Sequence, residues 1–411
     1  MAVSEPQALD PETAAAQAEA WVRNRLPASW ITAIDNDDAD ALAAARLEID
    51  EDKWFIDLAD EGYVTPGWPV EYGGLGVAPK VGSAIARVLG RYKVPRFTNP
   101  VGIDLVGPAL MKWGTDEHRD RFLRPIARHT EIWCQLFSEP GAGSDLASLA
   151  TRAVRDGDEW VVNGQKVWAS LAHLSSFGLL LARTDPDVPK HKGITVFLVP
   201  MDAPGVTIRP LPQITGDAEF NEVFLDDVRI PDSMRIGPVD EGWAVTMSVL
   251  LNERQSIAGS GASLPGTVTG RSVAGLIKRH SPVTDPSLRD RFAELYIEDR
   301  LVSLTNQRTS AKRRAGQAPG PEASITKLFF SEHTQRLHSF ALDLEGPAGQ
   351  AWVDGDRWHQ NTAWAYLRVR SKTIAGGTSE VQRNILGERV LGLPKEPSAD
   401  RGVPWSQVKR S

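Results

Sequence analysis

The sequence changes from a helical to a β pattern between about Glu131 and Ile230, and this change limits the possible folds more than any other feature. Runs rich in Val, Ile, Phe and Trp alternate there with Gly, Pro, Asp and Asn, as in GITVFLVP, GVTIRPL and NEVFLDDVRI. Such runs are typical of β-strands joined by tight turns. The pair Asn163-Gly164, between two such runs in EWVVNGQKVWAS, predicts a hairpin turn. We therefore expect an antiparallel sandwich or barrel of roughly 100 residues.

Both flanking regions have the period of amphipathic helices. Near the N-terminus, Asp10-Pro11-Glu12 combines an N-cap, a first-turn proline and an acidic residue, which together predict the start of a helix. After Pro231, long segments with helical periodicity predict a four-helix bundle, and the stretch from Ser260 to Gly270 predicts a loop. The expected fold is α+β, with an N-terminal helical domain at residues 1–130, a β domain at 131–232, a four-helix bundle at 233–395 and a tail at 396–411.

Composition argues against several classes of protein. A formal net charge of −7 gives no basic excess for nucleic-acid binding. The only cysteine, Cys134, rules out an internal disulfide framework and is expected to be a small buried apolar side chain. The histidines form no HxxxH or HExxH pair, so no metal site is expected. Without a signal peptide or an apolar run approaching ~20 residues, the sequence predicts a soluble cytoplasmic protein.

The stretch WCQLFSEPGAGSDLASL, from Trp133 to Leu149, is the most informative in the chain. Its glycines allow a ligand to approach the backbone closely, and successive N–H groups in such a turn can face an anion. Ser138 and Ser144 add hydroxyl groups. These residues alone leave two interpretations open, a ligand-binding turn and an ordinary turn.

This stretch resembles the signature of the acyl-CoA dehydrogenase family, and the resemblance extends over nearly the whole chain. Further similar motifs follow the family order around it, namely GWPVEYGGLG, VNGQKVWAS, FNEVFLDDVRIP, GPVDEGW and GGTSEVQRNILGERVLGLP. The resemblance implies an enzyme that binds FAD between its β domain and its C-terminal bundle. It also implies oxidation of an acyl-CoA thioester to the trans-2-enoyl-CoA.

The family pattern assigns roles to individual positions. The implied flavin contacts are Gln135, Leu136, Phe137, Ser138, Ser144, Trp168, Ala169, Ser170, Thr378 and Glu380. The implied substrate contacts are Ser144, Asn252, Arg254 and Gly377. Hydroxyl groups can donate to the ring heteroatoms of a flavin, and an indole can stack on the ring edge. Without the family pattern, Trp168 would be interpreted as core packing and Arg254 as a surface or ion-pair arginine.

The reaction needs a carboxylate base, and the family position that often supplies it is occupied here by Gly376 in IAGGTSEVQRN. Either the chain is inactive or the base lies elsewhere. A branch resembling isovaleryl-, long-chain and some steroid side-chain enzymes places the base in an LxER context, where this sequence has Glu253 in LLNER. Glu253 flanks the apolar stripe of its helix, so partial burial is expected to raise its pKa. The alternative is a solvated helix residue.

The Gly376 N–H is expected to polarise the thioester carbonyl, although this residue has no side chain. Glu380 is a weaker candidate base because it falls at a flavin-contact position. Ser379 and Gln382 fit a capping box, which predicts that a helix starts here. The missing side chain at Gly376 leaves room beside the reacting carbons, which favours a branched, cyclic or otherwise bulky acyl group.

Two departures from the family pattern concern the adenosine half of FAD. GRSVAGLIKRH contains no R-x-x-F-G motif, and DLEGPAGQ has Asp343 in place of a glutamine. Three functions therefore remain open. The first is an acyl-CoA dehydrogenase with an electron-transferring flavoprotein as acceptor, the second an acyl-CoA oxidase or flavin monooxygenase, and the third a non-catalytic subunit. A homodimer or homotetramer is expected, with a heteromer as the alternative.

Overall fold

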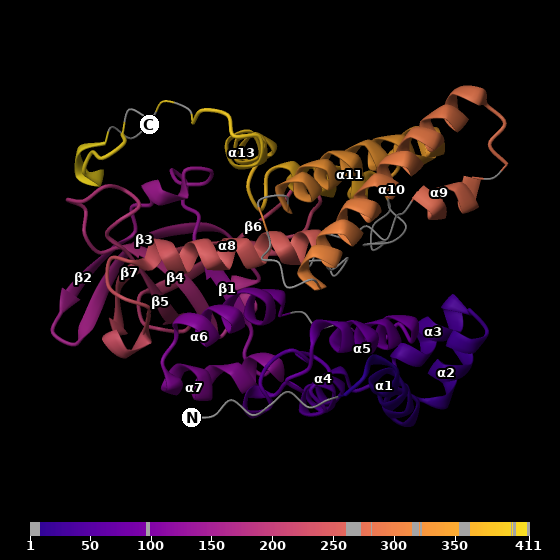
Figure 1. The fold of residues 1–411 in the computed structure, drawn as a ribbon, viewed down its shortest axis with the longest axis horizontal. Helices are drawn as coiled ribbons and strands as arrows, with labels where there is room; N and C mark the ends of the chain where they lie inside the picture. Colours follow the sequence, from indigo (N-terminus) through magenta and orange to yellow (C-terminus); the bar gives the residue numbers. More distant parts are fainter. Residues whose placement is uncertain are drawn as a thin grey trace. The chain divides into compact units, whose positions relative to one another are not determined.

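The computed structural model describes residues 9–95, 99–259, 273–280, 282–314, 320, 323–352, 362–395, 397 and 400–408 (Figure 1). The chain divides into two compact units. Unit 1 contains Met1–Gln135, Leu174–Leu179 and Leu198–Asp202, and unit 2 contains Leu136–His173, Leu180–Phe197 and Ala203–Ser411. No helix among the described residues is long and apolar enough to cross a membrane.

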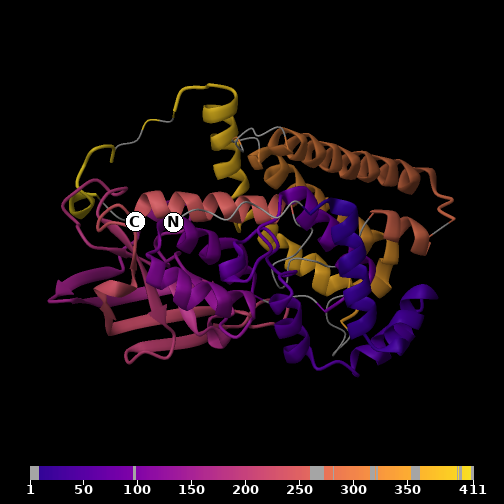
Figure 2. The same ribbon diagram turned by 60° about the horizontal axis from the view of Figure 1, so that its bottom comes forward.

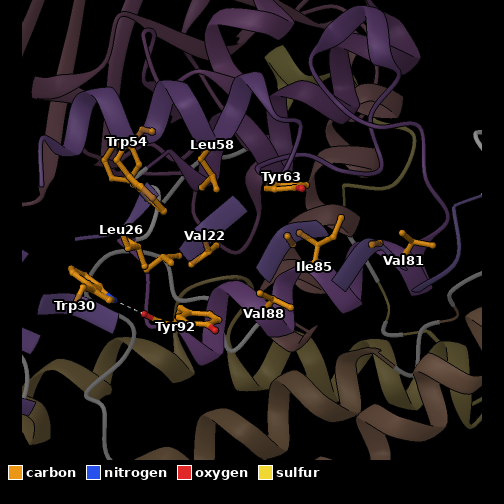
Figure 3. Close-up of a cluster of buried hydrophobic side chains, with 14 of the residues drawn as sticks. Val22, Leu26, Trp30, Trp54, Leu58, Tyr63, Val81, Ile85, Val88 and Tyr92 are labelled. Atoms are coloured by element: carbon orange, nitrogen blue, oxygen red, sulfur yellow. Dashed lines mark hydrogen bonds between the residues drawn. The ribbon is translucent and has the colours of Figure 1, made fainter. Parts of the chain in front are cut away.

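Unit 1 is mainly helical, as its sequence period predicts. Its helices are α1 (Pro11–Arg25), α2 (Ala28–Asp35), α3 (Ala39–Arg46), α4 (Glu51–Asp60), α5 (Pro79–Arg91), α6 (Gly107–Trp113) and α7 (Asp116–Ala127). The predicted start of the first helix is confirmed, because the Asp10 carboxylate accepts hydrogen bonds from the backbone N–H groups of Glu12 (2.9 Å) and Thr13 (3.0 Å). In the core, the buried Trp30 indole donates to the Tyr92 carbonyl at 2.8 Å (Figure 3).

Cys134 is fully buried, as the sequence predicts, and lies in β1 (Trp133–Leu136). Its Sγ is 3.7 Å from the Met201 sulfur. Burial raises the pKa of the Cys134 thiol to about 12, so the side chain is a neutral apolar group at physiological pH.

The β region forms a mainly antiparallel sheet. Its further strands are β2 (Arg152–Asp156), β3 (Glu159–Ser170), β4 (Phe177–Arg183), β5 (Ile194–Pro200), β6 (Val206–Leu211), β7 (Phe220–Pro231) and β8 (Arg235–Ile236). The strand order is β6-β7-β3-β2-β4-β5-β8, with β1 beside β4. The predicted antiparallel β domain is thus confirmed. The ends of β4 and β5 fall within unit 1, and the remaining residues of β2 to β8 lie in unit 2.

The predicted hairpin turn at Asn163-Gly164 is wrong, because β3 continues through both residues to Ser170. The hairpin instead lies between β2 and β3, where Asp156 pairs with Glu159. Gly164 serves close packing, since a Cβ at this position would lie 2.7 Å from the Thr151 Cβ. The pairing register also shifts here, as in a β-bulge.

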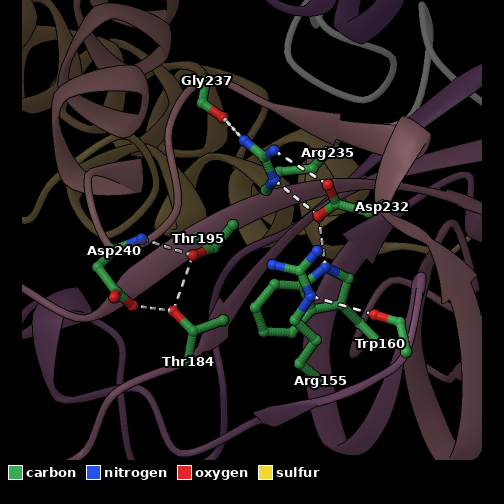
Figure 4. Close-up of polar contacts among 9 residues, drawn as sticks. Arg155, Trp160, Thr184, Thr195, Asp232, Arg235, Gly237 and Asp240 are labelled. Atoms are coloured by element: carbon green, nitrogen blue, oxygen red, sulfur yellow. Dashed lines mark hydrogen bonds and ion pairs between the residues drawn. The ribbon is translucent and has the colours of Figure 1, made fainter.

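A polar network holds the segment between the sheet and the next helix (Figure 4). The Asp232 carboxylate accepts hydrogen bonds from the Arg235 guanidinium (2.9 Å) and the Trp160 indole (2.8 Å), which lower the pKa of Asp232 to about 2. Nearby, the Asp240 backbone N–H donates to Thr195 Oγ1 at 2.9 Å. These contacts fix the chain just before helix α8 (Gly242–Gly259), which carries Glu253.

The remaining part of unit 2 is helical, and this confirms the predicted C-terminal helical domain. It contains α8, α9 (Val273–His280), α10 (Pro286–Arg314), α11 (Ala323–Glu345), α12 (Thr362–Arg368) and α13 (Ser379–Ile385). Helix α11 lies beside α10 (Figure 1) and also packs against α8, α9, α12 and α13, and Figure 2 shows this helical region from a second side. The rings of Phe292 and Phe340 meet edge to face at 4.7 Å in this core. The loop predicted from Ser260 to Gly270 lies outside the described residues.

Candidate active site

The Ser-Glu-Pro-Gly-Ala-Gly-Ser-Asp signature forms a tight turn after β1. Glu139 and Ala142 exchange backbone hydrogen bonds of 3.0 Å in both directions. Beyond them, Ser144 is exposed, and a Cβ added at Gly141 or Gly143 would meet no other atom within 4 Å. The turn therefore leaves its backbone open to the close approach of a ligand.

A buried ion pair between Glu139 and Lys166 stabilises this turn. The Lys166 ammonium lies 2.8 Å from Glu139 Oε1 and donates to the Phe137 carbonyl at 3.1 Å. The same carboxylate accepts from the N–H groups of Ala150 (2.6 Å) and Thr151 (2.9 Å). Burial alone would raise the pKa of Glu139, but the charge and hydrogen bond of Lys166 outweigh it and lower the pKa. The pair joins both ends of the signature turn to β3.

Trp168 lies on β3 beside the signature turn, at a second irregularity of the strand. Its φ is +62°, and the pairing of β3 with β7 shifts register between Lys166 and Ala169. The adjacent Val167 N–H donates to the Ser138 carbonyl at 2.9 Å. The indole is 60% exposed, so it is not the core side chain that its residue type alone would suggest. A bulge that turns an aromatic ring outward is consistent with a role in ligand contact.

The other predicted flavin contacts near Trp168 are less exposed to solvent than its indole. Ala169 is fully buried, and its carbonyl accepts a hydrogen bond from the Asn221 amide at 3.0 Å. Ser170 and Ser138 are half-buried. Leu136 and Phe137 are buried in unit 2, whereas Gln135 is half-buried and belongs to unit 1.

The Gly376-Gly377 turn has an unusual backbone that glycine permits. Their φ angles are +65° and +87°, in the left-handed region that side chains disfavour. The predicted capping box is wrong by one residue, because Thr378 is the N-cap of α13 and its Oγ1 accepts from Val381 N–H at 3.2 Å. The Gln382 amide instead donates to the carbonyls of Gly376 (3.0 Å) and Gly377 (3.3 Å).

Lys327 on α11 holds the same turn from the bundle side. Its Nζ donates to the carbonyls of Gly377 (2.5 Å) and Lys372 (3.1 Å), and its side chain is 1% exposed. Burial lowers the pKa of Lys327 to about 8, although the charges of Glu253, Glu380 and Glu332 oppose the shift. One buried amine thus lies within electrostatic reach of the Glu253 carboxylate and also bonds directly to the glycine turn.

The predicted base and two predicted substrate contacts, Glu253, Asn252 and Arg254, follow one another on α8. Asn252 and Glu253 are half-buried, and the Arg254 side chain lies outside the described residues. Glu380 is exposed, and a backbone N–H and Thr378 lower its pKa. A carboxylate with a lowered pKa is a weaker proton acceptor.

A short loop before β7 connects the sheet with the helices that lead to the glycine turn. Glu219 accepts a hydrogen bond from Leu171 N–H through its carbonyl (2.8 Å) and pairs with Arg368 through its carboxylate (2.5 Å). The Trp364 indole donates to Asp217 at 2.7 Å. The end of β3 and helix α12 are therefore anchored to the same loop in unit 2.

This combination of a helical region, a β domain with an open glycine-rich turn and a C-terminal helical region defines a known class of flavoprotein. The chain matches the family descriptions "Acyl-CoA dehydrogenase, N-terminal domain" at residues 17–130, "middle domain" at 134–228 and "C-terminal domain" at 240–391. It therefore belongs to the acyl-CoA dehydrogenase family. It is an enzyme of this family, whose members bind FAD.

Individual relatives agree with this assignment. Acyl-CoA dehydrogenase IpdE1 of Mycobacterium tuberculosis is 42% identical over 350 residues, covering 84% of this chain and 88% of the relative. Among solved structures, the Tcur3481-Tcur3483 steroid ACAD is 28% identical with a TM-score of 0.74, and the match covers 96% of this chain and 100% of that one. The ChsE4-ChsE5 complex from M. tuberculosis is 26% identical with a TM-score of 0.71, and the match covers 96% and 100%.

The residues present fit an FAD. The outward Trp168 indole offers an aromatic face, Ser138 and Ser170 offer hydroxyl groups, and the glycine turn leaves its backbone open. Glu139, Lys166, Lys327 and Gln382 support this site, although local sequence patterns do not identify them. One of them could have been found from the sequence. Lys166 occupies an inward position of β3, where an apolar residue is usual, and a buried lysine needs a partner.

Proposed function

We propose that the chain dehydrogenates a bulky acyl-CoA thioester to its trans-2-enoyl-CoA, with Glu253 removing the α-proton. The observation that carries this proposal is that one amine, that of Lys327, interacts both with Glu253 and with the glycine turn. Its pKa is affected by the charge of Glu253 on α8, and it hydrogen-bonds to the turn that lacks a carboxylate at Gly376. The proposal places this chain in the branch of the family whose base lies on the bundle helix.

The chain's own residues divide the chemistry between them. When bound, FAD supplies the acceptor for the hydride that leaves the β-carbon. The Glu253 carboxylate accepts the α-proton, and backbone N–H groups of the glycine turn polarise the thioester carbonyl, which acidifies that proton. Gln382 and Lys327 bind the Gly376 and Gly377 carbonyls, so the N–H groups of Gly377 and Thr378, which belong to the same trans peptides, point in the opposite direction.

The proposed flavin contacts are the residues that the family pattern assigns, with Ser138, Trp168, Ser170 and Thr378 as the main ones. Ser144, Asn252, Arg254 and Gly377 are proposed substrate contacts. We also propose the domain limits 1–130, 131–232 and 233–395, with a tail at 396–411.

Replacing Lys327 by Met is expected to reduce kcat by about ten- to a hundredfold while FAD stays bound, because the Gly377 carbonyl loses a charged donor. The pKa of Lys327 near 8 also predicts a matching inflection in the pH dependence of wild-type kcat. Steady-state rates from pH 6 to 10 test both points. An inflection that persists in the Met variant would show that another group causes it, and Lys327→Arg should retain part of the rate.

Substituting Gly376 by Ala is expected to lower kcat/KM for polycyclic or branched thioesters more than for butyryl-CoA. The added methyl group narrows the space beside the reacting carbons and strains a residue with a φ of +65°. The ratio of kcat/KM between the two substrate classes is the measurement, and the exposed neighbour Ala375→Ser is the control. Equal losses on both classes would contradict the bulky-substrate proposal.

Electrons are proposed to pass to an electron-transferring flavoprotein in the cytoplasm. An acyl-CoA oxidase remains the second candidate, and stoichiometric peroxide formation from substrate and air would favour it. A non-catalytic subunit remains the third. Absence of a yellow colour in the purified chain, together with restoration of colour by a second chain, would favour that role.

The assembly is proposed to be a homodimer or homotetramer, with a heteromer as the alternative. The alternative has support from two similar proteins, the Tcur3481-Tcur3483 steroid ACAD and the ChsE4-ChsE5 complex, whose names each join two chains. In addition, Asp343, which replaces the expected glutamine, pairs with Arg291 at 2.8 Å within this chain. Light scattering on the purified chain, alone and after co-expression with a paired subunit, distinguishes these assemblies.

A further inference from the structure

Residues 400–408 pack back onto the β domain, although they lie beyond the matched family range, which ends at residue 391. Residues 400–408 contain a short 3-10 helix, η9 (Trp405–Gln407), which is drawn in yellow in Figure 1. Trp405 is buried, with 8% exposure. The backbone N–H of Trp405 donates to the Val188 carbonyl, and the backbone N–H of Ser406 donates to the Pro186 carbonyl, both at 2.8 Å. The loop between β4 and β5 thus anchors the tail through its backbone.

The Trp405 side chain reaches the signature segment itself. Its indole N–H donates to the Ser148 carbonyl at 3.3 Å, and its ring lies 4.8 Å from the Arg183 guanidinium carbon. Arg183 is 1% exposed and donates to the carbonyls of Ala147 (2.6 Å) and Leu149 (3.4 Å). Trp405 and Arg183 therefore bind three consecutive carbonyls, those of residues 147 to 149, just after the signature turn.

A second contact joins the tail to the open part of the turn. The Lys190 ammonium bridges Asp145, at 2.8 Å, and Asp400, at 2.5 Å. Lys190 is 15% exposed, so this bridge is partly shielded from solvent. Asp145 directly follows Ser144, which the proposed function assigns to the acyl-CoA. The tail thus contacts this stretch directly at Ser148 and is linked to Asp145 through Lys190.

We propose that the C-terminal tail positions the signature turn for thioester binding, with Trp405 and Asp400 as positioning residues. This inference rests on the proposed function only in taking an acyl-CoA as the ligand of Ser144. A turn that is already ordered loses less conformational entropy when the ligand binds. The tail therefore increases affinity for the thioester without touching the reacting atoms.

Replacing Trp405 by Ala is expected to raise KM for the acyl-CoA about tenfold, with kcat within twofold of wild type and the flavin spectrum unchanged. Trp405→Phe should restore most of the affinity, since it keeps the ring over Arg183. Gln407→Ala is the matched control, because Gln407 is an exposed residue of the same short helix. An unchanged KM in Trp405→Ala would overturn the proposal.

A second variant and a second readout cover the case in which the Ala variant is too unstable. Asp400→Asn removes only the outer end of the Lys190 bridge and is expected to raise KM two- to threefold. Amide hydrogen exchange in residues 140–149 should be faster in both tail variants than in Gln407→Ala, and equal exchange would overturn the proposal. If wild type reacts with no thioester, the proposed function fails, while faster exchange in the variants would still support a positioning tail.

Discussion

Replacing Glu253 by Gln is expected to lower kcat about a thousandfold and to leave FAD bound. The amide has nearly the same shape but cannot accept the α-proton, and general base catalysis of this kind contributes ~10²- to 10⁴-fold. FAD should be retained because its proposed contacts at Ser138, Trp168 and Ser170 come from the β domain. Stopped-flow absorbance at the flavin band, with the enzyme mixed anaerobically with acyl-CoA, measures the reductive step directly.

The matched control for this variant is Glu332→Gln on α11. Glu332 also influences the pKa of Lys327, and it forms an ion pair with Arg383. It therefore tests whether any lost charge around Lys327 slows the reaction. Near wild-type bleaching in Glu253→Gln would remove Glu253 from the mechanism, and equal losses in both variants would indicate a general electrostatic effect. Exchange of the substrate α-proton with D2O should likewise disappear only in Glu253→Gln.

Lys166→Met is expected to lower the free energy of unfolding by about 3–5 kcal/mol, because it leaves the Glu139 carboxylate buried without its counter-ion. The double variant Glu139→Gln/Lys166→Met should lose less, since the buried carboxylate is removed together with its counter-ion. The control is Arg229→Met on the neighbouring β7, which breaks exposed ion pairs and should cost less than about 1 kcal/mol. Urea denaturation at pH 7 gives these differences, and equal losses in Lys166→Met and Arg229→Met would contradict the assignment.

The same pair predicts a pH dependence with a definite sign. The pKa of Glu139 in the folded chain lies below its ordinary value of 4.5, so protons bind more readily to the unfolded chain. The stabilisation by the pair is fully present above about pH 4.5 and is lost as the pH falls through the folded pKa. The stability difference between wild type and the double variant should therefore shrink in acid. A constant difference from pH 7 to pH 3 would show that Glu139 does not titrate with folding.

Sequence reasoning works well where the relevant signal is periodic or local. The helical, β and helical regions follow from side-chain periodicity, and the helix start at Asp10 follows from residues within three positions of it. Two local patterns predict the wrong contacts. Asn163-Gly164 fits a hairpin, but Gly164 is needed for its approach to Thr151, and Gln382 bonds the glycine carbonyls instead of capping its own helix.

The residues that support the site are separated widely in the chain. Lys327 lies 50 residues before the Gly377 carbonyl that it binds, and Trp405 lies 257 residues after the Ser148 carbonyl. A single sequence gives no local sign of such pairs, since a lysine in an amphipathic helix or a tryptophan in a tail has many ordinary explanations. The outward position of Trp168 is similar, because it depends on a register shift in β3 that residue types do not reveal.

Anaerobic titration of the purified holoenzyme is the sharpest test of the proposal that this chain dehydrogenates bulky acyl-CoA thioesters. A yellow protein titrated with a branched or polycyclic acyl-CoA should lose its visible flavin absorbance with about one equivalent of substrate. Butyryl-CoA should bleach it much more slowly. An unchanged spectrum with every thioester would contradict the proposed dehydrogenase activity, and faster bleaching by butyryl-CoA than by any bulky substrate would contradict the proposed substrate class.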